Sequence, residues 1–346
     1  MRKVAFIIND ISNIGGTQKV VEILANAFVS KLGFDIVIYT LNMNNEIEMD
    51  NSRINIINLN SKFNILSLIK SFSRINRLNK ELEVDFVIGI GVYISVFLPL
   101  LKDVKTIACE HNSFDIVSKK TNFVRHHMYK YIDFIISLTD EDLNQYKNIN
   151  KNSYVIPNPI SFELCEFPFE NKENIVTAIG TLNKRKGFDR LLMIWSLLNE
   201  DLRKKYILNI FGEGDELSSL LNLKDKLKLE NVFFKGNTKQ VKLELERSKL
   251  FLMTSHKEGL PMTLLESMSC KTPCISFDIK TGPKEIISNN ENGCIIPDGN
   301  YDLYVEKIEM LLTNESKLKE FSHQAIMGVE KYKLDNVLLL WKNILC

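Results

Sequence analysis

The chain has 346 residues, of which 45% are hydrophobic, and its 44 basic and 43 acidic residues leave a net charge of +1. This length is about twice the commonest domain size, so two domains are expected, each large enough to bury a core. The balanced charge excludes a protein that binds nucleic acid through a strongly basic surface.

The cysteines and the apolar runs indicate where the protein works. Six cysteines are present without a Cys-x-x-Cys pair or histidines at metal-ligand spacing, so we expect reduced core thiols and no metal centre. The apolar run at residues 4–8 is too short for a signal peptide, and no stretch approaches the roughly 18 residues of a membrane span. We therefore expect a cytoplasmic protein.

Short β-branched and aromatic runs recur along the chain, and each is followed by an amphipathic stretch of helical length, which is typical of parallel βαβ units. The strands predicted in the first half are residues 4–8, 35–40, 54–59, 84–90, 105–109, 134–138 and 154–156. Those in the second half are residues 175–180, 206–211, 232–235, 250–254, 273–277 and 293–296. The prediction is an α/β protein with two Rossmann-like, doubly wound parallel sheets.

The domain boundary is predicted near residue 160. Pro157, Asn158 and Pro159 begin a segment through residue 171 in which two prolines bar a regular helix and no clean period is present. The predicted domains are therefore residues 1–158 and 159–330. Residues 331–346 contain a helical pattern that could either cap the second domain or cross back to the first.

Gly15 and Gly16 lie between the first predicted strand and a helix that runs to about Ser30. Two glycines at such a turn let the backbone approach a ligand, and free amides at a helix start attract an oxyanion. The pair fits either a site for a diphosphate or an acceptor oxygen, or a tight turn. A full Gly-x-Gly-x-x-Gly pattern is absent.

Residues 61–82 alternate basic and apolar side chains and contain no acid before Glu81. A basic amphipathic helix can lie on an anionic membrane and bring a lipid-linked acceptor within reach. Alternatively, its apolar stripe packs on the first sheet while the lysines are solvated. The two interpretations are compatible, and the sequence does not choose between them.

The segment from Ser255 to Glu266 follows a predicted strand and contains a proline suited to the first turn of a helix. Its backbone amides are expected to point into a cleft between the domains and to bind a diphosphate. The residues expected there are Gly259, Leu260, Pro261, Met262 and Thr263. Two carboxylates accompany them, and each can accept hydrogen bonds from a vicinal diol, with Glu258 assigned to sugar hydroxyls and Glu266 to the ribose.

With these motifs in view, the chain resembles a retaining glycosyltransferase of family 4 with the GT-B architecture, whose Glu-x7-Glu motif matches Glu258 and Glu266. The resemblance covers nearly the full length and is strongest from about residue 155 to residue 298. Supporting matches occur in the same order at residues 155–159, 180–189 and 211–215. The resemblance implies two domains facing a central cleft, with residues 1–158 binding the acceptor and residues 159–330 binding the nucleotide sugar. It also implies a role in bacterial surface polysaccharide synthesis, with a saccharide acceptor that is lipid-linked.

The resemblance also implies roles for single residues. Lys186 matches the lysine that contacts the donor diphosphate, where a cation offsets the charge that develops as the nucleoside diphosphate leaves. The family often has arginine after Gly180, where this chain has Thr181, and Arg185 is expected to supply that charge. His111, which follows Glu110, matches a histidine that faces the donor sugar. Alternatively, 184–186 is a solvated basic run and 110–112 only a turn.

Asp140 and Asp142 could be taken for a metal-binding Asp-x-Asp pair, but they follow Thr139 at a predicted helix start, where acids favour the helix dipole. We therefore expect no metal and no cofactor apart from the nucleoside diphosphate sugar.

Residues 281–287 resemble a segment of bacterial members that use UDP-hexose or UDP-N-acetylhexosamine donors, which favours UDP. The alternatives are a sugar-nucleotide epimerase and a non-enzymatic sugar-nucleotide-binding protein. A nicotinamide dehydrogenase is disfavoured because neither half has its glycine fingerprint.

Overall fold

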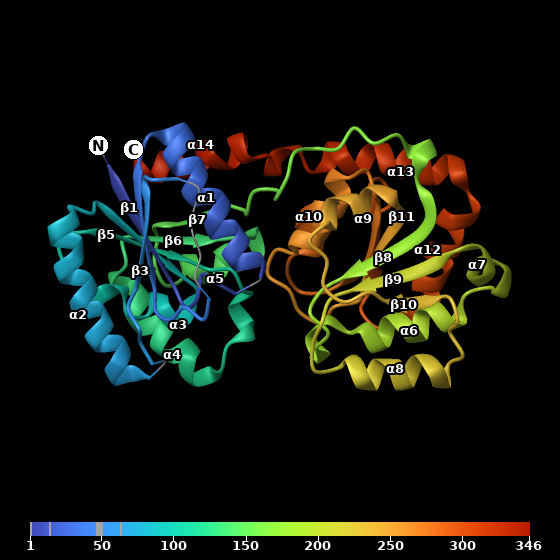
Figure 1. The fold of residues 1–346 in the computed structure, drawn as a ribbon, viewed down its shortest axis with the longest axis horizontal. Coiled ribbons are helices and arrows are strands. Elements are labelled where there is room, and N and C mark those ends of the chain that lie inside the picture. The colour runs from blue at the N-terminus through green and yellow to red at the C-terminus, as the bar shows by residue number, and fades with distance from the viewer. Residues whose placement is uncertain (1, 14, 46–50, 63) are drawn as a thin grey trace. The chain divides into compact units, whose positions relative to one another are not determined.

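The computed structural model describes residues 2–13, 15–45, 51–62 and 64–346. The chain divides into two compact units, which we call unit 1 (Met1–Ser161 with Leu334–Cys346) and unit 2 (Phe162–Lys333). Figure 1 shows that each unit has its own sheet with helices on both faces. The division after Ser161 falls within the proline-containing segment in which the sequence predicts a boundary.

Unit 1 is built on a parallel sheet of seven strands in the order β3-β2-β1-β4-β5-β6-β7. The strands are β1 (Lys3–Ile8), β2 (Asp35–Thr40), β3 (Ile54–Asn58), β4 (Phe86–Ile90), β5 (Lys105–Cys109), β6 (Phe134–Ser137) and β7 (Ser153–Val155). The strand sequences are nearly continuous apolar runs because helices cover both faces of the sheet. In register, Phe6 of β1 lies between Ile38 of β2 and Ile88 of β4.

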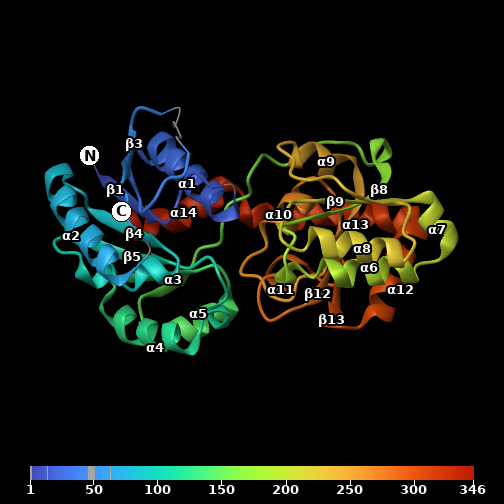
Figure 2. The same cartoon turned by 60° about the horizontal axis from the view of Figure 1, so that its bottom comes forward.

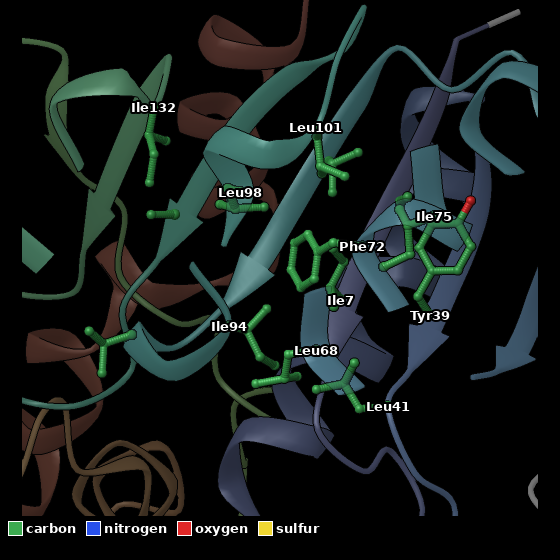
Figure 3. Close-up of a cluster of buried hydrophobic side chains, with 14 of the residues drawn as sticks. Ile7, Tyr39, Leu41, Leu68, Phe72, Ile75, Ile94, Leu98, Leu101 and Ile132 are labelled. Carbon is green, nitrogen blue, oxygen red and sulfur yellow. The ribbon is translucent and has the colours of Figure 1, made fainter. Parts of the chain in front are cut away.

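The helices of unit 1 cover both faces of this sheet (Figure 2). They are α1 (Gly16–Leu32), α2 (Ile65–Leu82), α3 (Val92–Ser95), α4 (Lys119–Met128), α5 (Asp140–Lys147) and α14 (Leu334–Leu345). On one face, Leu68, Phe72 and Ile75 of α2 are buried against sheet residues that include Ile7 and Tyr39 (Figure 3). The apolar stripe predicted in residues 61–82 therefore packs on the sheet.

The C-terminal helix α14 belongs to unit 1 although it follows unit 2 in the chain. The ring of Trp341 meets the ring of Phe28 edge-on, with centroids 5.7 Å apart. The Arg2 guanidinium donates to the Cys346 carbonyl at 2.9 Å, which ties the two ends of the chain together. The sequence leaves two positions open for this helix, and in the structure it crosses back to the first domain.

Unit 2 is a second parallel sheet, with six strands in the order β10-β9-β8-β11-β12-β13. The strands are β8 (Glu173–Ile179), β9 (Ile207–Phe211), β10 (Val232–Phe234), β11 (Ser248–Met253), β12 (Cys274–Asp278) and β13 (Gly293–Pro297). The helices are α6 (Phe188–Leu197), α7 (Glu200–Lys205), α8 (Leu217–Lys226), α9 (Val241–Arg247), α10 (Met262–Ser269), α11 (Pro283–Ile286), α12 (Tyr301–Thr313) and α13 (Glu315–Gly328). All thirteen predicted strands are present, and their ends differ from the prediction by no more than two residues, which confirms the doubly wound α/β fold.

A buried lysine fastens the start of unit 2 to its sheet. The Lys172 ammonium donates to the carbonyls of Ser248 and Cys270, at 2.9 and 3.1 Å, and to the Thr272 hydroxyl at 2.7 Å. Burial lowers the pKa of Lys172 to about 8. Nearby, the Cys165 amide donates to the Ser269 carbonyl at 2.9 Å. These bonds fix the segment that enters unit 2 against the end of α10.

Candidate functional site

The order of the strands in unit 2 reverses between β8 and β11. In doubly wound sheets, ligands bind outside the carboxyl ends of the strands at such a switch point. Two of the predicted motifs lie in the loops that leave these two strands: residues 184–186 follow β8 as a single 3-10 turn, and residues 254–261 follow β11. The topology therefore brings together two motifs that lie about 70 residues apart in the sequence.

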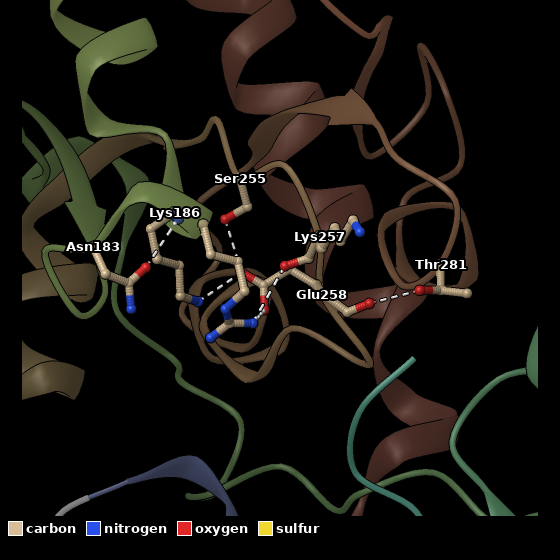
Figure 4. Close-up of polar contacts among 7 residues, drawn as sticks. Asn183, Lys186, Ser255, Lys257, Glu258 and Thr281 are labelled. Carbon is tan, nitrogen blue, oxygen red and sulfur yellow. Dashed lines mark hydrogen bonds and ion pairs between the residues drawn. The ribbon is translucent and has the colours of Figure 1, made fainter. Parts of the chain in front are cut away.

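Glu258 is the centre of this site, and its carboxylate meets two cations and a hydroxyl (Figure 4). Oε1 accepts from the Lys186 ammonium at 2.6 Å and from the Ser255 hydroxyl at 2.8 Å. Oε2 accepts from the Arg185 guanidinium at 3.2 Å. The structure thus brings together three residues that belong to two separate motifs in the sequence.

Burial separates Lys186 from the rest of the basic run, since Lys184 is exposed and Arg185 is partly exposed. Glu258 is only 6% exposed, and the Lys186 side chain is 15% exposed. A buried carboxylate costs free energy unless it is paired, and here the two cations and the hydroxyl are the partners of Glu258. Two positive charges against one negative charge leave the cluster with an excess of one positive charge.

The loop at 281–283 packs directly on the loop that carries Glu258. The Thr281 hydroxyl donates to the Glu258 carbonyl at 2.6 Å. Gly282 has a φ of 99° in the left-handed region, and a Cβ there would lie 2.3 Å from the Gly259 carbonyl oxygen. Only glycine fits this close approach of two backbones. The segment that the sequence links to UDP donors therefore forms part of the same site.

Helix α10 begins directly after this loop, with Pro261 as its N-cap and Met262 as its first residue. The first turn contains no acidic side chain, so the amides at the helix start remain suited to an anion. Leu260 is buried, whereas Met262 and Thr263 are partly exposed. Glu266 lies one turn inside α10, as its spacing to Glu258 predicts, and its side chain is buried.

An arginine that the sequence motifs do not reveal supports the same loop. Arg190 is the one cation on the apolar helix α6, a signal that could have been noticed, and its guanidinium lies 3.9 Å from the centroid of the Phe277 ring. It meets the His256 Nδ1 atom at 3.2 Å and pairs with Asp298. The His256 amide in turn donates to the Arg185 carbonyl at 2.8 Å. Arg190 thereby helps to hold the two loops of the site together.

In unit 1, the predicted residue His111 lies just after β5, next to a buried acid. Glu110 accepts a short hydrogen bond from the Tyr129 hydroxyl, and burial raises its pKa to about 7. His111 Nδ1 has no hydrogen-bond partner within the described part of the chain, and Nε2 lies 3.6 Å from the Cys109 sulfur. Burial lowers the pKa of His111 to about 4, so its ring is neutral at pH 7.

Two further buried side chains hold the loop that follows His111, and neither was predicted for this purpose. The Arg125 guanidinium donates to the Phe114 carbonyl at 2.7 Å and lies 3.4 Å from the centroid of the Phe114 ring. The Asp142 carboxylate accepts from the Phe114 amide at 2.9 Å. A side chain from each of two helices therefore fixes the single residue Phe114, and with it the loop from β5 to α4.

The acidic run at 140–142 lies in the first turn of α5, as predicted. Thr139 caps this helix, because its hydroxyl accepts from the Asp142 amide at 3.2 Å. The Asp142 carboxylate is engaged with Phe114, in addition to its place in the first turn. Within residues 2–13, 15–45, 51–62 and 64–346, no three His, Cys, Asp or Glu side chains are grouped so that they could hold a metal ion.

Gly15 and Gly16 lie where α1 begins, with Gly15 as the N-cap and no side-chain cap. The Gly15 carbonyl accepts from the Lys19 amide at 3.1 Å, and the first turn contains no acid. A Cβ on Gly15 would meet only the flexible Gln18 side chain, so neighbouring backbone does not require glycine there. The predicted role of the pair in binding an oxyanion stays a prediction.

The chain is similar to known glycosyltransferases over its full length. Residues 163–327, which make up most of unit 2, match the family model described as glycosyl transferases group 1. The amylovoran biosynthesis glycosyltransferase AmsD of Erwinia amylovora is 29% identical, and the match covers 100% of both chains. The GalNAc-alpha-(1->4)-GalNAc-alpha-(1->3)-diNAcBac-PP-undecaprenol alpha-1,4-N-acetyl-D-galactosaminyltransferase of Campylobacter jejuni is 26% identical, over 100% of this chain and 98% of the relative.

Solved structures show the same fold. A mutant of S. aureus TarM, determined with fondaparinux, alpha-GlcNAc-glycerol and UDP, superposes with a TM-score of 0.79 at 17% identity, over 100% of both chains. No helix in the described part of the chain is long and apolar enough to span a membrane. The matched second domain, the full-length relatives and the two parallel-sheet units together identify the chain as a glycosyltransferase of the GT-B architecture.

Proposed function

We propose that this protein is a retaining, metal-independent glycosyltransferase of family 4. It transfers a hexosyl or N-acetylhexosaminyl group from a UDP-sugar to a saccharide acceptor. The observation that carries this proposal is the cluster of Lys186 and Arg185 on the buried Glu258 carboxylate, beside the start of α10. Two cations and a set of helix-start amides suit a diphosphate better than they suit any neutral ligand.

The chemistry of transfer follows from what this cluster offers. When the bond between the anomeric carbon and the diphosphate oxygen breaks, negative charge grows on that oxygen, and Lys186 with Arg185 stabilises it. The acceptor hydroxyl attacks the same face of the sugar, and its proton passes to the departing phosphate oxygen. No protein nucleophile and no metal ion is required in this route, and the anomeric configuration is retained. Glu266 would accept hydrogen bonds from the ribose.

The cation cluster also suggests a role for Glu258 besides contact with sugar hydroxyls. Its carboxylate is occupied by Lys186, Arg185 and Ser255 within unit 2. An acid that holds two long cationic side chains in one geometry reduces the entropy lost when the diphosphate binds. We therefore assign Glu258 first to positioning the cations.

We propose a lipid-linked acceptor in bacterial polysaccharide synthesis. The names of the Erwinia and Campylobacter relatives, which refer to amylovoran and to an undecaprenol-linked saccharide, support this class. In unit 1, the first turn of α2 leaves Ile65 and Leu66 exposed, at 69% and 75%, and Lys70 follows on the same helix. Exposed apolar side chains beside a cation are suited to the surface of an anionic membrane.

The test is a product analysis with the full chain. Radiolabelled UDP-glucose, UDP-N-acetylglucosamine and UDP-N-acetylgalactosamine are each incubated with undecaprenyl-diphosphate-linked saccharides, with and without EDTA. We expect label on the lipid-linked product, one UDP released per sugar transferred, an α-anomeric signal by NMR, and no effect of EDTA.

Three outcomes would contradict parts of the proposal. Interconversion of UDP-sugars without release of UDP would indicate an epimerase. Tight donor binding without turnover of any donor would indicate a non-enzymatic binding protein. A loss of transfer in EDTA that manganese restores would overturn the metal-independent mechanism.

A further inference from the structure

One buried arginine connects the carboxyl ends of four neighbouring strands in unit 2. Arg190 is 5% exposed and lies on α6, which follows β8 in the chain. Its guanidinium contacts His256 in the loop after β11, the ring of Phe277 near the end of β12, and Asp298 directly after β13. The strands β8, β11, β12 and β13 lie side by side in the sheet. A single side chain therefore spans most of the edge at which the candidate site lies.

His256 relays this contact to the cation cluster. Arg190 Nη1 meets His256 Nδ1 at 3.2 Å, and because a guanidinium can only donate, the imidazole nitrogen accepts. The His256 backbone amide donates to the Arg185 carbonyl at 2.8 Å. The Arg185 guanidinium in turn contacts the Glu258 carboxylate. A continuous path of contacts thus leads from Arg190 to one of the two cations of the site.

The second cation is held close to Arg190 by a contact between two backbones. Gly187, which directly follows Lys186, has a φ of 62° in the left-handed region. A Cβ on Gly187 would lie 2.4 Å from the Thr254 carbonyl oxygen and 3.1 Å from the Arg190 Cδ atom. The Thr254 hydroxyl also donates to the Gly187 carbonyl at 2.8 Å. The turn that carries Lys186 is therefore packed against both the loop after β11 and the side chain of Arg190.

The other partners of Arg190 use the planar shape of its guanidinium. The guanidinium carbon lies 3.9 Å from the centroid of the Phe277 ring, while Nη2 pairs with the Asp298 carboxylate and Nη1 meets His256. A guanidinium can stack on a ring and donate from its edge at the same time, whereas a lysine ammonium is a single point charge. The position therefore suits arginine better than any other cation.

The site depends on how accurately its charges are placed. Arg185 and Lys186 have long side chains on one short 3-10 turn, residues 184–186. A misplacement of about 1 Å in a catalytic arrangement can cost about 10² in rate. Arg190 acts on this turn through His256 and through the packing at Gly187, rather than through the Glu258 carboxylate itself.

We propose that Arg190 is a positioning residue for the donor diphosphate. Through His256 it sets the backbone at Arg185, and its pairing with Asp298 anchors this arrangement to the end of β13. The ligand in this inference rests on the proposed function, but the ordering of the two loops can be measured without any ligand.

The test compares the wild-type chain with Arg190→Met, which keeps much of the packing volume, and with His256→Ala. Amide hydrogen exchange of the ligand-free chain is followed by mass spectrometry, and UDP binding by titration calorimetry. We expect exchange in both residues 181–187 and residues 254–260 to become about fivefold faster in each variant, since the contact that joins these loops is lost. The Kd for UDP should rise about fivefold in Arg190→Met and somewhat less in His256→Ala.

Arg247→Met is the matched control. Arg247 also pairs with a carboxylate in unit 2, that of Glu173 at 2.6 Å, but these residues lie at the amino ends of β11 and β8. This variant should leave the exchange of both loops and the Kd for UDP unchanged. Arg190→Lys should fall between wild type and Arg190→Met, because a lysine can pair with Asp298 or reach His256 but cannot do both.

Kinetics distinguish positioning of the donor from a general loss of structure. Where transfer is observed, Arg190→Met should raise the KM for the UDP-sugar and lower kcat, and leave the KM for the saccharide acceptor unchanged. The double variant Arg190→Met/His256→Ala should bind UDP about as weakly as Arg190→Met alone, since both changes interrupt the same path.

Several results would overturn the inference. They are unchanged exchange in either loop of Arg190→Met, UDP affinity equal to that of the wild type, or exchange that rises equally throughout unit 2. If Arg190→Met does not fold, His256→Ala decides by the same measurements, because the His256 side chain is exposed and its loss leaves the core intact. If the wild-type chain binds neither UDP nor a UDP-sugar, the proposed function fails, while the exchange rates still decide whether Arg190 orders the two loops.

Discussion

At the carboxyl edge of unit 2, two loops bring a lysine and an arginine onto one buried carboxylate, and a helix begins beside them. At the carboxyl edge of unit 1, the loops after β1, β2 and β3 present asparagines around a hollow whose described lining has a single lysine. Both edges belong to parallel doubly wound sheets with the same course of the chain around a switch point. The comparison shows that the same edge of one fold can carry loops of different character, with paired charges in one unit and carboxamides in the other.

The two units also stabilise a buried acid in different ways. In unit 2, Glu258 is in direct contact with two cations. In unit 1, Glu110 has a tyrosine hydroxyl as its partner, and burial outweighs the more distant charge of Arg125, so its pKa rises to about 7. A buried acid with a hydroxyl partner and a buried acid with two cations as partners should therefore respond differently to mutation.

The largest effect is expected where the charges of unit 2 are removed. Lys186→Ala leaves the buried Glu258 without its shortest ion pair and removes a cation from the leaving diphosphate. We expect a loss of kcat of about 10² to 10³, the size seen when a preorganised charge donor is deleted. Arg185→Ala is the matched comparison, since this guanidinium contacts the same carboxylate from a more exposed position and should cost less.

A double-mutant cycle sharpens this prediction. If Glu258 acts by positioning the cations, Glu258→Gln and Lys186→Ala should be strongly non-additive, because each removes the same ion pair. Steady-state kinetics of both single variants and the double variant would measure this coupling. Additive losses would mean that Glu258 acts on the sugar independently of Lys186.

The second prediction concerns the pH dependence of unit 1. The pKa of Glu110 is about 7 in the folded chain against a usual value of 4.5, so between these values the folded state binds more protons than the unfolded state. The contribution of this group to the free energy of unfolding therefore falls as the pH rises from 4.5 to 7. The fall amounts to roughly 1.4 kcal/mol for each unit by which folding raises the pKa. Glu110→Gln removes this fall, because its amide does not ionise.

Thermal unfolding at pH 5 and pH 8 checks this prediction. Relative to wild type, Glu110→Gln should be more stable at pH 8 than at pH 5. Glu141→Gln, an exposed acid in the same unit, should show no such dependence. An equal difference between wild type and Glu110→Gln at both pH values would contradict a raised pKa.

The sequence was sufficient for the fold because its signals were local and repeated. Apolar runs followed by amphipathic stretches predicted every strand, since a buried parallel strand must be apolar on both faces. The segment from Ser255 to Glu266 was predicted for the same reason, because a proline-started helix after a strand has a strong local pattern. The contact of Lys186 with Glu258 followed only from the positions of β8 and β11 in the sheet.

Other parts of the site lacked a local signal. Arg190 was missed because its partners, Phe277 and Asp298, lie about 90 and 110 residues away. Interactions that depend on the order of strands in a sheet cannot be obtained from the pattern of one segment.

The smallest effect is expected at Asp142. Its substitution tests whether this acid has a structural role or binds a metal ion. Its carboxylate accepts from the Phe114 amide at 2.9 Å, and an asparagine could accept the same bond through its carbonyl oxygen. Asp142→Asn should therefore change kcat by less than about threefold, since the bond that orders the loop after His111 is kept. Asp142→Ala leaves the buried amide unpaired and should cost about 1 to 3 kcal/mol of unfolding free energy. Chemical unfolding and transfer kinetics of the two variants measure these effects, and a loss of transfer in Asp142→Asn as large as in Lys186→Ala would show that the carboxylate itself takes part in the reaction.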